Sequence, residues 1–295
     1  MIRSLAALIL SLFLPVSSSA AESHFAVARI HTPVLNTPDF PAVFGGKDGN
    51  TLQEDECGQL GSLEFVALPG TVFTMEAELR QGSQKIYRVK TADYPYPAKS
   101  GYFVDARFVT LQADRPPERT AVLPAKDDII AALRKRAGSR YVWGGNNAEG
   151  IAELLLWYPP AINSTLSDAE LNLWTLAGVD CSGLLYEATC GYTPRNTSAL
   201  LHFGKSVSVA GKSLPEITAS LQPLDLLVWP GHVLIVLDGN TLIESRLVCH
   251  EPEKGVRIRP IAEALNDIMK KRKPADGVKN GRSEFVVRRW YGVSQ

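Results

Sequence analysis

The chain has 295 residues, and its 31 Lys and Arg residues are balanced by 31 Asp and Glu residues. This balance excludes a strongly basic protein, and nothing in it points to nucleic acid, so we expect no nucleic-acid partner. The length allows two modest domains.

Residues 1–21 have the composition of a signal peptide. Arg3 supplies a positive charge, residues 5–16 are apolar, and Ala20 and Ala21 offer a small-residue cleavage site. A retained membrane anchor is the alternative, but the apolar run is shorter than the roughly 20 residues that span a bilayer. We therefore expect an exported protein, periplasmic or associated with the cell wall, without stable membrane insertion after cleavage.

Residues 24–112 are predicted to form a small β-barrel. β-Branched and aromatic residues gather in short runs that Gly, Pro, Asn and Asp separate, which is typical of strands and turns. Several short strands in about 90 residues favour a barrel. The expected strands are 25–30, 63–68, 72–79, 86–90 and 102–104. Residues 113–125 carry paired prolines flanked by charges and are predicted to be an exposed linker.

Residues 126–295 are predicted to form an α+β domain, because helices come first and antiparallel strands later. Apolar residues recur at helical spacing early in this part, and Ser167 and Glu170 have the spacing of a capping box. The expected helices are 127–137, 153–158, 167–176 and one that begins after Asp180, and the expected strands are 226–229, 232–237, 241–246 and 284–290.

The chain contains four cysteines, and their pairing depends on whether the protein is exported. Exported proteins tend to pair their cysteines. Cys181 and Cys190 are nine residues apart on one predicted helix and lie on opposite faces, so we do not expect them to pair. The pairing of Cys57, Cys190 and Cys249 with one another stays open. Because no spaced Cys and His set accompanies Cys249 and His250, we expect no metal site and no cofactor.

Cys181 is the candidate nucleophile. Asp180 is a good helix N-cap, which places Cys181 in the first helical turn. Unpaired N–H groups and the helix dipole at that turn favour the thiolate, so we expect the pKa of Cys181 to be lowered. A buried structural cysteine is the alternative.

His232 and Glu244 are the candidate partners of that nucleophile. His232 opens an apolar strand, residues 238–240 (Asp-Gly-Asn) predict a turn, and Glu244 lies on the returning strand. Their separation of 12 residues puts both side chains on one face of the hairpin. A packed core histidine and a solvent-facing glutamate are the alternatives. Together with Cys181, the pair indicates a nucleophile, a base and a residue that orients the base.

Five motifs in this order resemble the NlpC/p60 family of papain-like cell-wall cysteine peptidases. The likeness covers residues 126–250, and the 12-residue step from His232 to Glu244 also matches the family. The front part resembles a bacterial SH3-like module in its size, its strands and the segment 101–104 (Gly-Tyr-Phe-Val). The five motifs are Tyr-Val-Trp-Gly-Gly at 141–145, Asp-Cys-Ser-Gly at 180–183, Pro-Arg-Asn-Thr-Ser at 194–198, Leu-Gln-Pro-Leu-Asp-Leu at 221–226 and Gly-His-Val at 231–233.

The resemblance implies a papain-like (NlpC-type) catalytic domain over 126–295, with helices on an antiparallel sheet. It also implies a peptidoglycan hydrolase that cleaves stem peptides between γ-D-glutamate and a diamino acid through an acyl-enzyme. The implied catalytic residues are Cys181, His232 and Glu244, and the implied substrate-binding residues are Tyr141, Asp180 and Ser182.

The expected partner is peptidoglycan or a muropeptide, and we expect a monomer. Two alternatives are an N-acetylmuramoyl-L-alanine amidase and a transacylase with the same three residues. A third alternative is a non-catalytic wall-binding protein.

The chain departs from the family pattern in three places. Glu244 stands where His, Asn or Gln is usual, and Leu224 stands where Gly is common, which we interpret as harmless. Between Gly145 and Asp180 lie 34 residues, and the extra segment (about 147–178) is either a lid over the cleft or a decorating helical hairpin. Residues 270–273 (Lys-Lys-Arg-Lys) are interpreted as a solvated loop with a weak attraction for anionic wall polymers.

Overall fold

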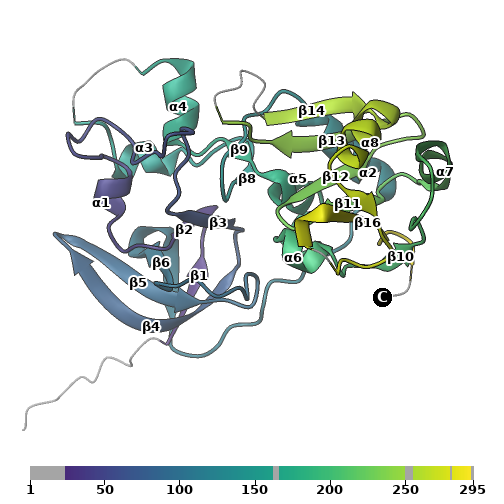
Figure 1. Ribbon diagram of the computed structural model, residues 1–295. Coiled ribbons are helices and arrows are strands. Elements are labelled where there is room, and N and C mark those ends of the chain that lie inside the picture. The colour runs from purple at the N-terminus through teal and green to yellow at the C-terminus, as the bar shows by residue number, and fades with distance from the viewer. Residues whose placement is uncertain (1–23, 162–165, 250–254, 280, 294–295) are drawn as a thin grey trace, which may run out of the picture.

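The computed structural model describes residues 24–161, 166–249, 255–279 and 281–293 (Figure 1). The predicted signal peptide at 1–21 and the residue His250 lie outside this part. Within the described part, no helix combines the length and the apolar character that a membrane span requires.

The front part of the chain forms a seven-stranded antiparallel sheet in the order β3-β2-β6-β5-β4-β1-β7. Within the described residues 24–112, β3 and β7 are the two edges and do not pair with each other, so the sheet does not close and the predicted SH3-like β-barrel is not confirmed. The short strands β2 and β7 were not predicted. The elements are β1 Phe25–Ala28, β2 Thr32–Leu35, α1 Phe40–Val43, β3 Leu63–Ala67, β4 Val72–Gln81, β5 Gln84–Lys90, β6 Tyr102–Asp105, η1 Ala106–Phe108 and β7 Val109–Gln112.

The rear part is an α+β unit, as predicted, built on an antiparallel sheet in the order β10-β16-β11-β12-β13-β14. A short strand, β15, pairs in parallel with β16. The strands are β8 Asn146–Asn147, β9 Gly178–Val179, β10 Lys205–Val207, β11 Leu226–Trp229, β12 His232–Val236, β13 Thr241–Arg246, β14 Gly255–Pro260, β15 Lys273–Pro274 and β16 Glu284–Arg289. The helices are α2 Lys126–Lys135, α3 Glu153–Trp157, α4 Asp168–Trp174, α5 Cys181–Ala188, α6 Thr197–Leu200, α7 Leu214–Ser220, α8 Ile261–Met269 and η2 Gly281–Ser283.

Two helical layers cover the rear sheet. Leu226 and Val228 of β11 join a core with α2 and α5, whereas Leu227 joins a separate core with α7 and α8. This alternation follows from the two-residue repeat of a strand, which sends successive side chains to opposite faces. The sheet is therefore buried on both faces, and α5 lies on the side that faces the front unit (Figure 1).

β14 and α8 were not predicted, although their sequence contains the signals. Val256, Arg257, Ile258 and Arg259 alternate between apolar and basic residues, as a strand with two different faces does. In α8, the buried residues Ile261, Ala264, Leu265 and Ile268 recur at helical spacing. The basic residues of β14, Arg257 and Arg259, lie next to Glu244 of β13.

The extra segment packs against the front unit. It is bracketed by the β8–β9 pair, and its residues Ile151, Leu154 and Tyr158 belong to the core of the front sheet. Trp174 Nε1 donates a hydrogen bond to the Tyr158 carbonyl oxygen at 2.7 Å. The capping box predicted at Ser167 is present at the start of α4. These contacts favour the decorating hairpin over the lid, because they join the segment to the core of the other unit.

The segment 113–125 has no regular secondary structure, but it is anchored to both units. Arg119 donates to the carbonyl oxygens of Cys190 at 3.1 Å and Gly191 at 3.3 Å, at the end of α5. Its guanidinium also lies 3.4 Å from the carboxylate of Asp93 in the front unit. The linker therefore holds the two units together as well as connecting them.

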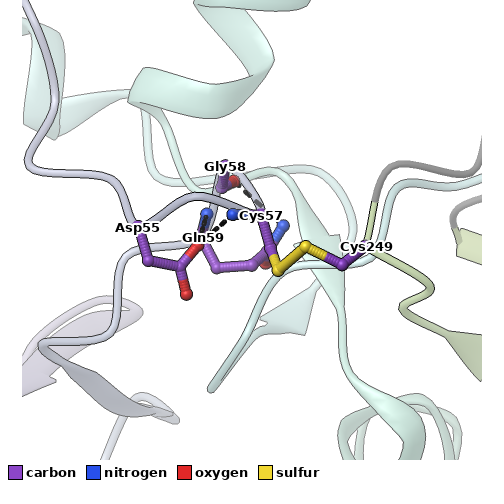
Figure 2. The surroundings of a disulfide bond; sticks show 5 residues. All are labelled: Asp55, Cys57, Gly58, Gln59 and Cys249. Atoms are coloured by element: carbon purple, nitrogen blue, oxygen red, sulfur yellow. Dashed lines mark hydrogen bonds between the residues drawn. A yellow bond between two sulfur atoms is a disulfide. The ribbon is translucent and has the colours of Figure 1, made fainter.

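A disulfide between Cys57 and Cys249 also joins the two units, across 192 residues of sequence (Figure 2). Asp55 Oδ1 accepts hydrogen bonds from the backbone N–H of Cys57 at 2.8 Å and of Gln59 at 2.9 Å, which fixes the loop that carries Cys57. Cys190 is exposed and unpaired, and Cys181 is also free. The pairing that the sequence left open is thus Cys57 with Cys249.

We expect the double variant Cys57→Ser/Cys249→Ser to unfold more easily than the wild type. A crosslink over so long a stretch restricts the unfolded chain, and its loss typically lowers the free energy of unfolding by about 2–4 kcal/mol. Urea unfolding without reductant measures this change. Cys190→Ser is the matched control and should change the free energy by less than about 0.5 kcal/mol. Equal unfolding midpoints for the double variant and the wild type would contradict the prediction.

Candidate active site

Cys181 is the first residue of α5, as predicted, and its side chain is buried. Asp180 caps the helix: its Oδ1 atom accepts a hydrogen bond from the Gly183 N–H at 2.7 Å. As the first helical residue, Cys181 has a backbone N–H without a partner inside the helix. That N–H is available to a negatively charged oxygen that forms beside the sulfur.

Arg195 binds the start of α5 through a buried network. It makes two hydrogen bonds to the Asp180 carboxylate, at 3.0 and 2.8 Å, and one to the Gly145 carbonyl oxygen at 3.0 Å. Ser182 Oγ donates to the Arg195 carbonyl oxygen at 2.8 Å. The side chain of Arg195 is only 3% exposed, so this ion pair is nearly free of solvent. The sequence offered Arg195 as part of a motif but no signal of this role.

The three predicted substrate-binding residues therefore lie in different surroundings. The polar groups of Asp180 and Ser182 are buried and bonded to Arg195, whereas Tyr141 lines an open cavity. Burial raises the pKa of the Tyr141 phenol, and the charge of Asp180 raises it further. Tyr141 thus lines the cavity as a neutral side chain.

His232 and Glu244 meet across the β12–β13 hairpin. Asp238 Oδ1 accepts hydrogen bonds from the N–H groups of Asn240 and Thr241, which forms the predicted turn. The register pairs Ile235 with Ile243, so Glu244 lies diagonally across from His232 on the same face. His232 Nε2 and Glu244 Oε2 are 2.7 Å apart. An ionised carboxylate only accepts, so Nε2 carries the proton and Nδ1 of the neutral ring has the free lone pair.

Two arginines of β14 hold the other oxygen of Glu244. Arg257 Nη2 lies 2.9 Å and Arg259 Nη1 lies 3.4 Å from Glu244 Oε1. Burial by itself raises the pKa of Glu244, but the hydrogen bond from His232 and the charges of His232 and Arg257 outweigh it and lower the pKa to about 2. Glu244 is therefore ionised at any physiological pH and can stabilise a protonated His232. Sequence reasoning missed both arginines because it missed β14.

We expect the Glu244 carboxylate to make the protein acid-sensitive. Its pKa is about 2 in the folded chain against an ordinary value of 4.5, so its stabilising effect is complete above pH 4.5 and disappears as the pH falls toward 2. This group should change the free energy of unfolding by up to about 1.4 kcal/mol per pH unit in that window.

Urea unfolding of the wild type and of Glu244→Gln between pH 4.5 and 2 measures this effect, because glutamine cannot titrate. Glu263→Gln is the control, since Glu263 is an exposed partner of the same Arg259. The prediction fails if Glu244→Gln and the wild type lose stability with the same slope.

The sulfur of Cys181 lies against the backbone on both sides of His232. Its Sγ atom is 3.9 Å from the Gly231 carbonyl oxygen and interacts with the N–H of Val233. Among the described residues, no direct hydrogen bond joins Cys181 to His232. Val233 and Ile235 of β12 join the core that contains Cys181, whereas Leu234 joins the core with α8. Because His232 shares the strand face of Leu234, the structure places the side chains of Cys181 and His232 on different faces of β12. Hydrogen bonds between catalytic groups often tighten only when substrate is bound.

The predicted lowering of the Cys181 pKa is wrong for the structure as it stands. Burial raises the pKa of the thiol to about 12, and the negative charge of Asp180 adds to this effect. The charge of Arg195 and the neighbouring N–H groups act in the opposite direction but are weaker. Cys181 is therefore a neutral thiol at rest, because loss of solvent outweighs the helix terminus.

A cavity of about 630 Å³ opens beside His232 and Glu244. Tyr141, Trp143 and Trp229 contribute aromatic walls, and the rings of Trp229 and His232 are 5.1 Å apart between centroids. The lining also includes the basic residues 270–272, which the sequence had suggested to be a solvated loop. The site thus combines an imidazole, aromatic surface and positive charge in one hollow.

Leu224, the residue at the position where glycine is common in the family, has a φ of 72°. This left-handed conformation favours glycine and costs a leucine about 1 kcal/mol or more. The side chain is nevertheless buried in the core that includes α5. The departure is therefore not free of strain, contrary to the interpretation from sequence.

The described residues contain no group of three or more His, Cys, Asp or Glu side chains that could hold a metal ion. No protein-family model matches the sequence. No curated protein shows significant similarity to it either.

Solved structures do show similarity. An NlpC/p60 family protein from Bacillus cereus is 18% identical with a TM-score of 0.34, and the alignment covers 92% of this chain and 65% of that chain. NlpC1 from Trichomonas vaginalis is 11% identical with a TM-score of 0.30, covering 96% of this chain and 98% of that chain. RipD from Mycobacterium tuberculosis is 17% identical with a TM-score of 0.31, and the alignment covers 56% of this chain and 95% of that chain. RipD is described as a non-catalytic NlpC/p60 domain protein adapted to peptidoglycan binding.

The chain thus spans slightly less than two thirds of the Bacillus cereus protein. The structural neighbours across most of the chain are NlpC/p60 family proteins.

Proposed function

We propose that this chain is an exported peptidoglycan hydrolase, a cysteine endopeptidase that cleaves stem-peptide amide bonds. The observation that carries the proposal is the 2.7 Å contact between His232 and Glu244, next to an unpaired cysteine whose sulfur contacts the backbone on both sides of that histidine. A buried carboxylate that orients an imidazole, with a free thiol against the backbone of the same strand, supplies the three groups that nucleophilic catalysis uses. The mechanism requires the His232 ring to turn toward Cys181 in the substrate complex.

The first chemical step is attack on the scissile carbonyl. The Cys181 thiol gives its proton to His232 Nδ1 as the sulfur forms a bond to the carbonyl carbon. The carbonyl oxygen becomes negative and is stabilised by the Cys181 backbone N–H. Glu244, with its pKa of about 2, stays ionised and stabilises the imidazolium. Since the thiol is neutral at rest, this proton transfer occurs in the substrate complex.

The second step releases the amine. His232 gives its proton to the leaving nitrogen as the carbon–nitrogen bond breaks, which leaves an acyl group on Cys181. A water molecule then loses a proton to His232 and adds to the acyl carbon, and the carboxylic acid departs as the sulfur takes the proton back. The scissile bond that the motifs favour lies between γ-D-glutamate and a diamino acid, and Tyr141 lines the cavity in which that peptide would bind.

A non-catalytic wall-binding protein is the second candidate, and the burial of Cys181 with its raised pKa favours it. RipD shows that an NlpC/p60 domain can serve peptidoglycan binding without catalysis. The ionised Glu244 on His232 favours the enzyme instead, because binding alone gives no reason to hold a buried carboxylate against an imidazole.

Digestion of purified peptidoglycan by the mature protein, read by mass spectrometry, tests the proposal. Products with a new free amine on the diamino acid support the endopeptidase. Products separated between muramic acid and L-alanine would indicate an amidase, and peptides joined to an added amine would indicate a transacylase. Unchanged peptidoglycan that nevertheless binds the protein would favour the wall-binding alternative.

A further inference from the structure

The turn after α8 places an unpaired guanidinium in the cavity that contains His232. Arg272 lies over the ring of Trp229, with its Cζ atom 4.3 Å from the ring centroid. Trp229 in turn contacts the His232 ring at 5.1 Å between centroids. The chain of contacts therefore runs from the catalytic imidazole through one tryptophan to Arg272.

Arg272 is held in place by its backbone. Its N–H donates to the Ile268 carbonyl oxygen at 2.8 Å, and the Lys271 N–H donates to the same oxygen at 2.9 Å. These bonds continue the end of α8, so the turn is part of the helix terminus. Stacking on Trp229 then fixes the plane of the guanidinium, as is usual for arginine on an aromatic face.

The acidic residues near Arg272 are bound to other cations. Glu244 pairs with His232, Arg257 and Arg259, and Asp267 pairs with Arg259 and Lys270. Within the described part of the chain, Arg272 has no ion pair, and its buried Nε atom has no hydrogen-bond partner. A cation with an unsatisfied donor, lining a cavity beside a catalytic group, has the properties of an anion subsite.

The other charges on this wall agree with that assignment. Lys271 and Arg246 also line the cavity, and neither forms an ion pair among the residues that the structure describes. Arg282 lies close enough for its charge to lower the pKa of Arg272, after the larger effect of burial. The wall therefore has a positive charge that no acidic group of the described chain balances, and a negatively charged ligand would relieve the repulsion.

We propose that Arg272 binds a carboxylate carried by the leaving half of the substrate, such as the second carboxyl group of a dicarboxylic diamino acid. This inference deepens the proposed function and rests on it for the direction of the substrate: His232 protonates the leaving amine, and Arg272 lies on the His232 side of the cavity, next to Trp229. A planar guanidinium stacked on an aromatic ring matches a carboxylate with two parallel hydrogen bonds. The subsite would select acidic diamino acids over neutral or basic ones.

Binding to the inactive Cys181→Ala protein tests the subsite without requiring catalysis. Two synthetic stem peptides are compared by calorimetry, identical except that the second carboxyl group of the diamino acid is free in one and amidated in the other. We expect the free acid to bind about tenfold or more tightly, as is typical for a hydrogen bond to a charged group.

Adding Arg272→Gln to the Cys181→Ala protein should remove that preference. The affinity for the free-acid peptide should fall about tenfold, and the affinity for the amidated peptide less than about threefold. Arg272→Lys should restore part of the preference, since it keeps the charge and loses the second hydrogen bond. Arg115→Gln, an exposed arginine of the linker, is the matched control and should preserve the preference.

The outcomes separate this inference from the proposed function. A preference for the free acid that survives Arg272→Gln, equal weakening of both peptides, or no binding of either peptide would overturn the subsite. A preference that depends on Arg272, combined with a wild-type protein that cleaves neither peptide, would overturn the hydrolase and leave the subsite standing. Thermal melting of each variant shows that the loss does not come from unfolding.

Discussion

Replacing Cys181 by alanine should abolish peptidoglycan hydrolysis, lowering kcat by at least about 10⁴-fold, as expected when a covalent nucleophile is removed. The physical reason is that no other thiol lies near His232 among the described residues: Cys57 and Cys249 are bonded to each other, and Cys190 is exposed beyond the far end of α5. Release of peptides from purified sacculi, followed over time, measures the effect.

Cys190→Ala is the matched control for this prediction. It removes a thiol from the same region of the chain, but from an exposed residue whose hydrogen bond to Arg119 of the linker uses the backbone carbonyl oxygen. Its kcat should stay within about twofold of the wild type, as for a surface substitution away from the site. Substantial hydrolysis by Cys181→Ala would show that the nucleophile lies elsewhere and would remove the basis of the proposed mechanism.

Replacing Arg195 by methionine should lower the free energy of unfolding by about 3–5 kcal/mol, because it leaves the buried Asp180 carboxylate without its partner. Arg195 also bonds to Asn146 Oδ1 at 3.0 Å and to the Gly145 carbonyl oxygen, so its loss affects the segment that leads to the Cys181 helix. Urea unfolding measures the change, and hydrolysis should fall with it, since Asp180 caps the helix that begins at Cys181.

Two further variants show whether burial is the cause. Arg195→Met/Asp180→Asn removes the uncompensated charge and should recover part of the lost stability. Arg134→Met breaks an ion pair with Asp238 in which both side chains are more than two-fifths exposed, and it should cost less than about 1 kcal/mol. If Arg195→Met costs no more than Arg134→Met, the buried network does not stabilise the start of α5.

Local sequence signals predicted the elements that depend on neighbouring residues. Asp180 caps α5, Ser167 and Glu170 form the capping box of α4, and Asp238 forms the turn that brings His232 to Glu244. Each of these features requires only a side chain and a backbone group a few residues away. β14 and α8 were not predicted, although the sequence of each has the periodicity of its element.

The sequence by itself determined the α+β organisation of the rear unit, the helix that begins at Cys181 and the shared face of His232 and Glu244. Only the tertiary structure decided which charges and thiols come together from distant parts of the chain. It paired Cys57 with Cys249, and it stacked Arg272 on Trp229. It also buried Cys181 so fully that its pKa rises to about 12 against the effect of the helix terminus. Desolvation, ion pairing and disulfide bonding depend on distances in space, and spacing along the chain does not specify those distances.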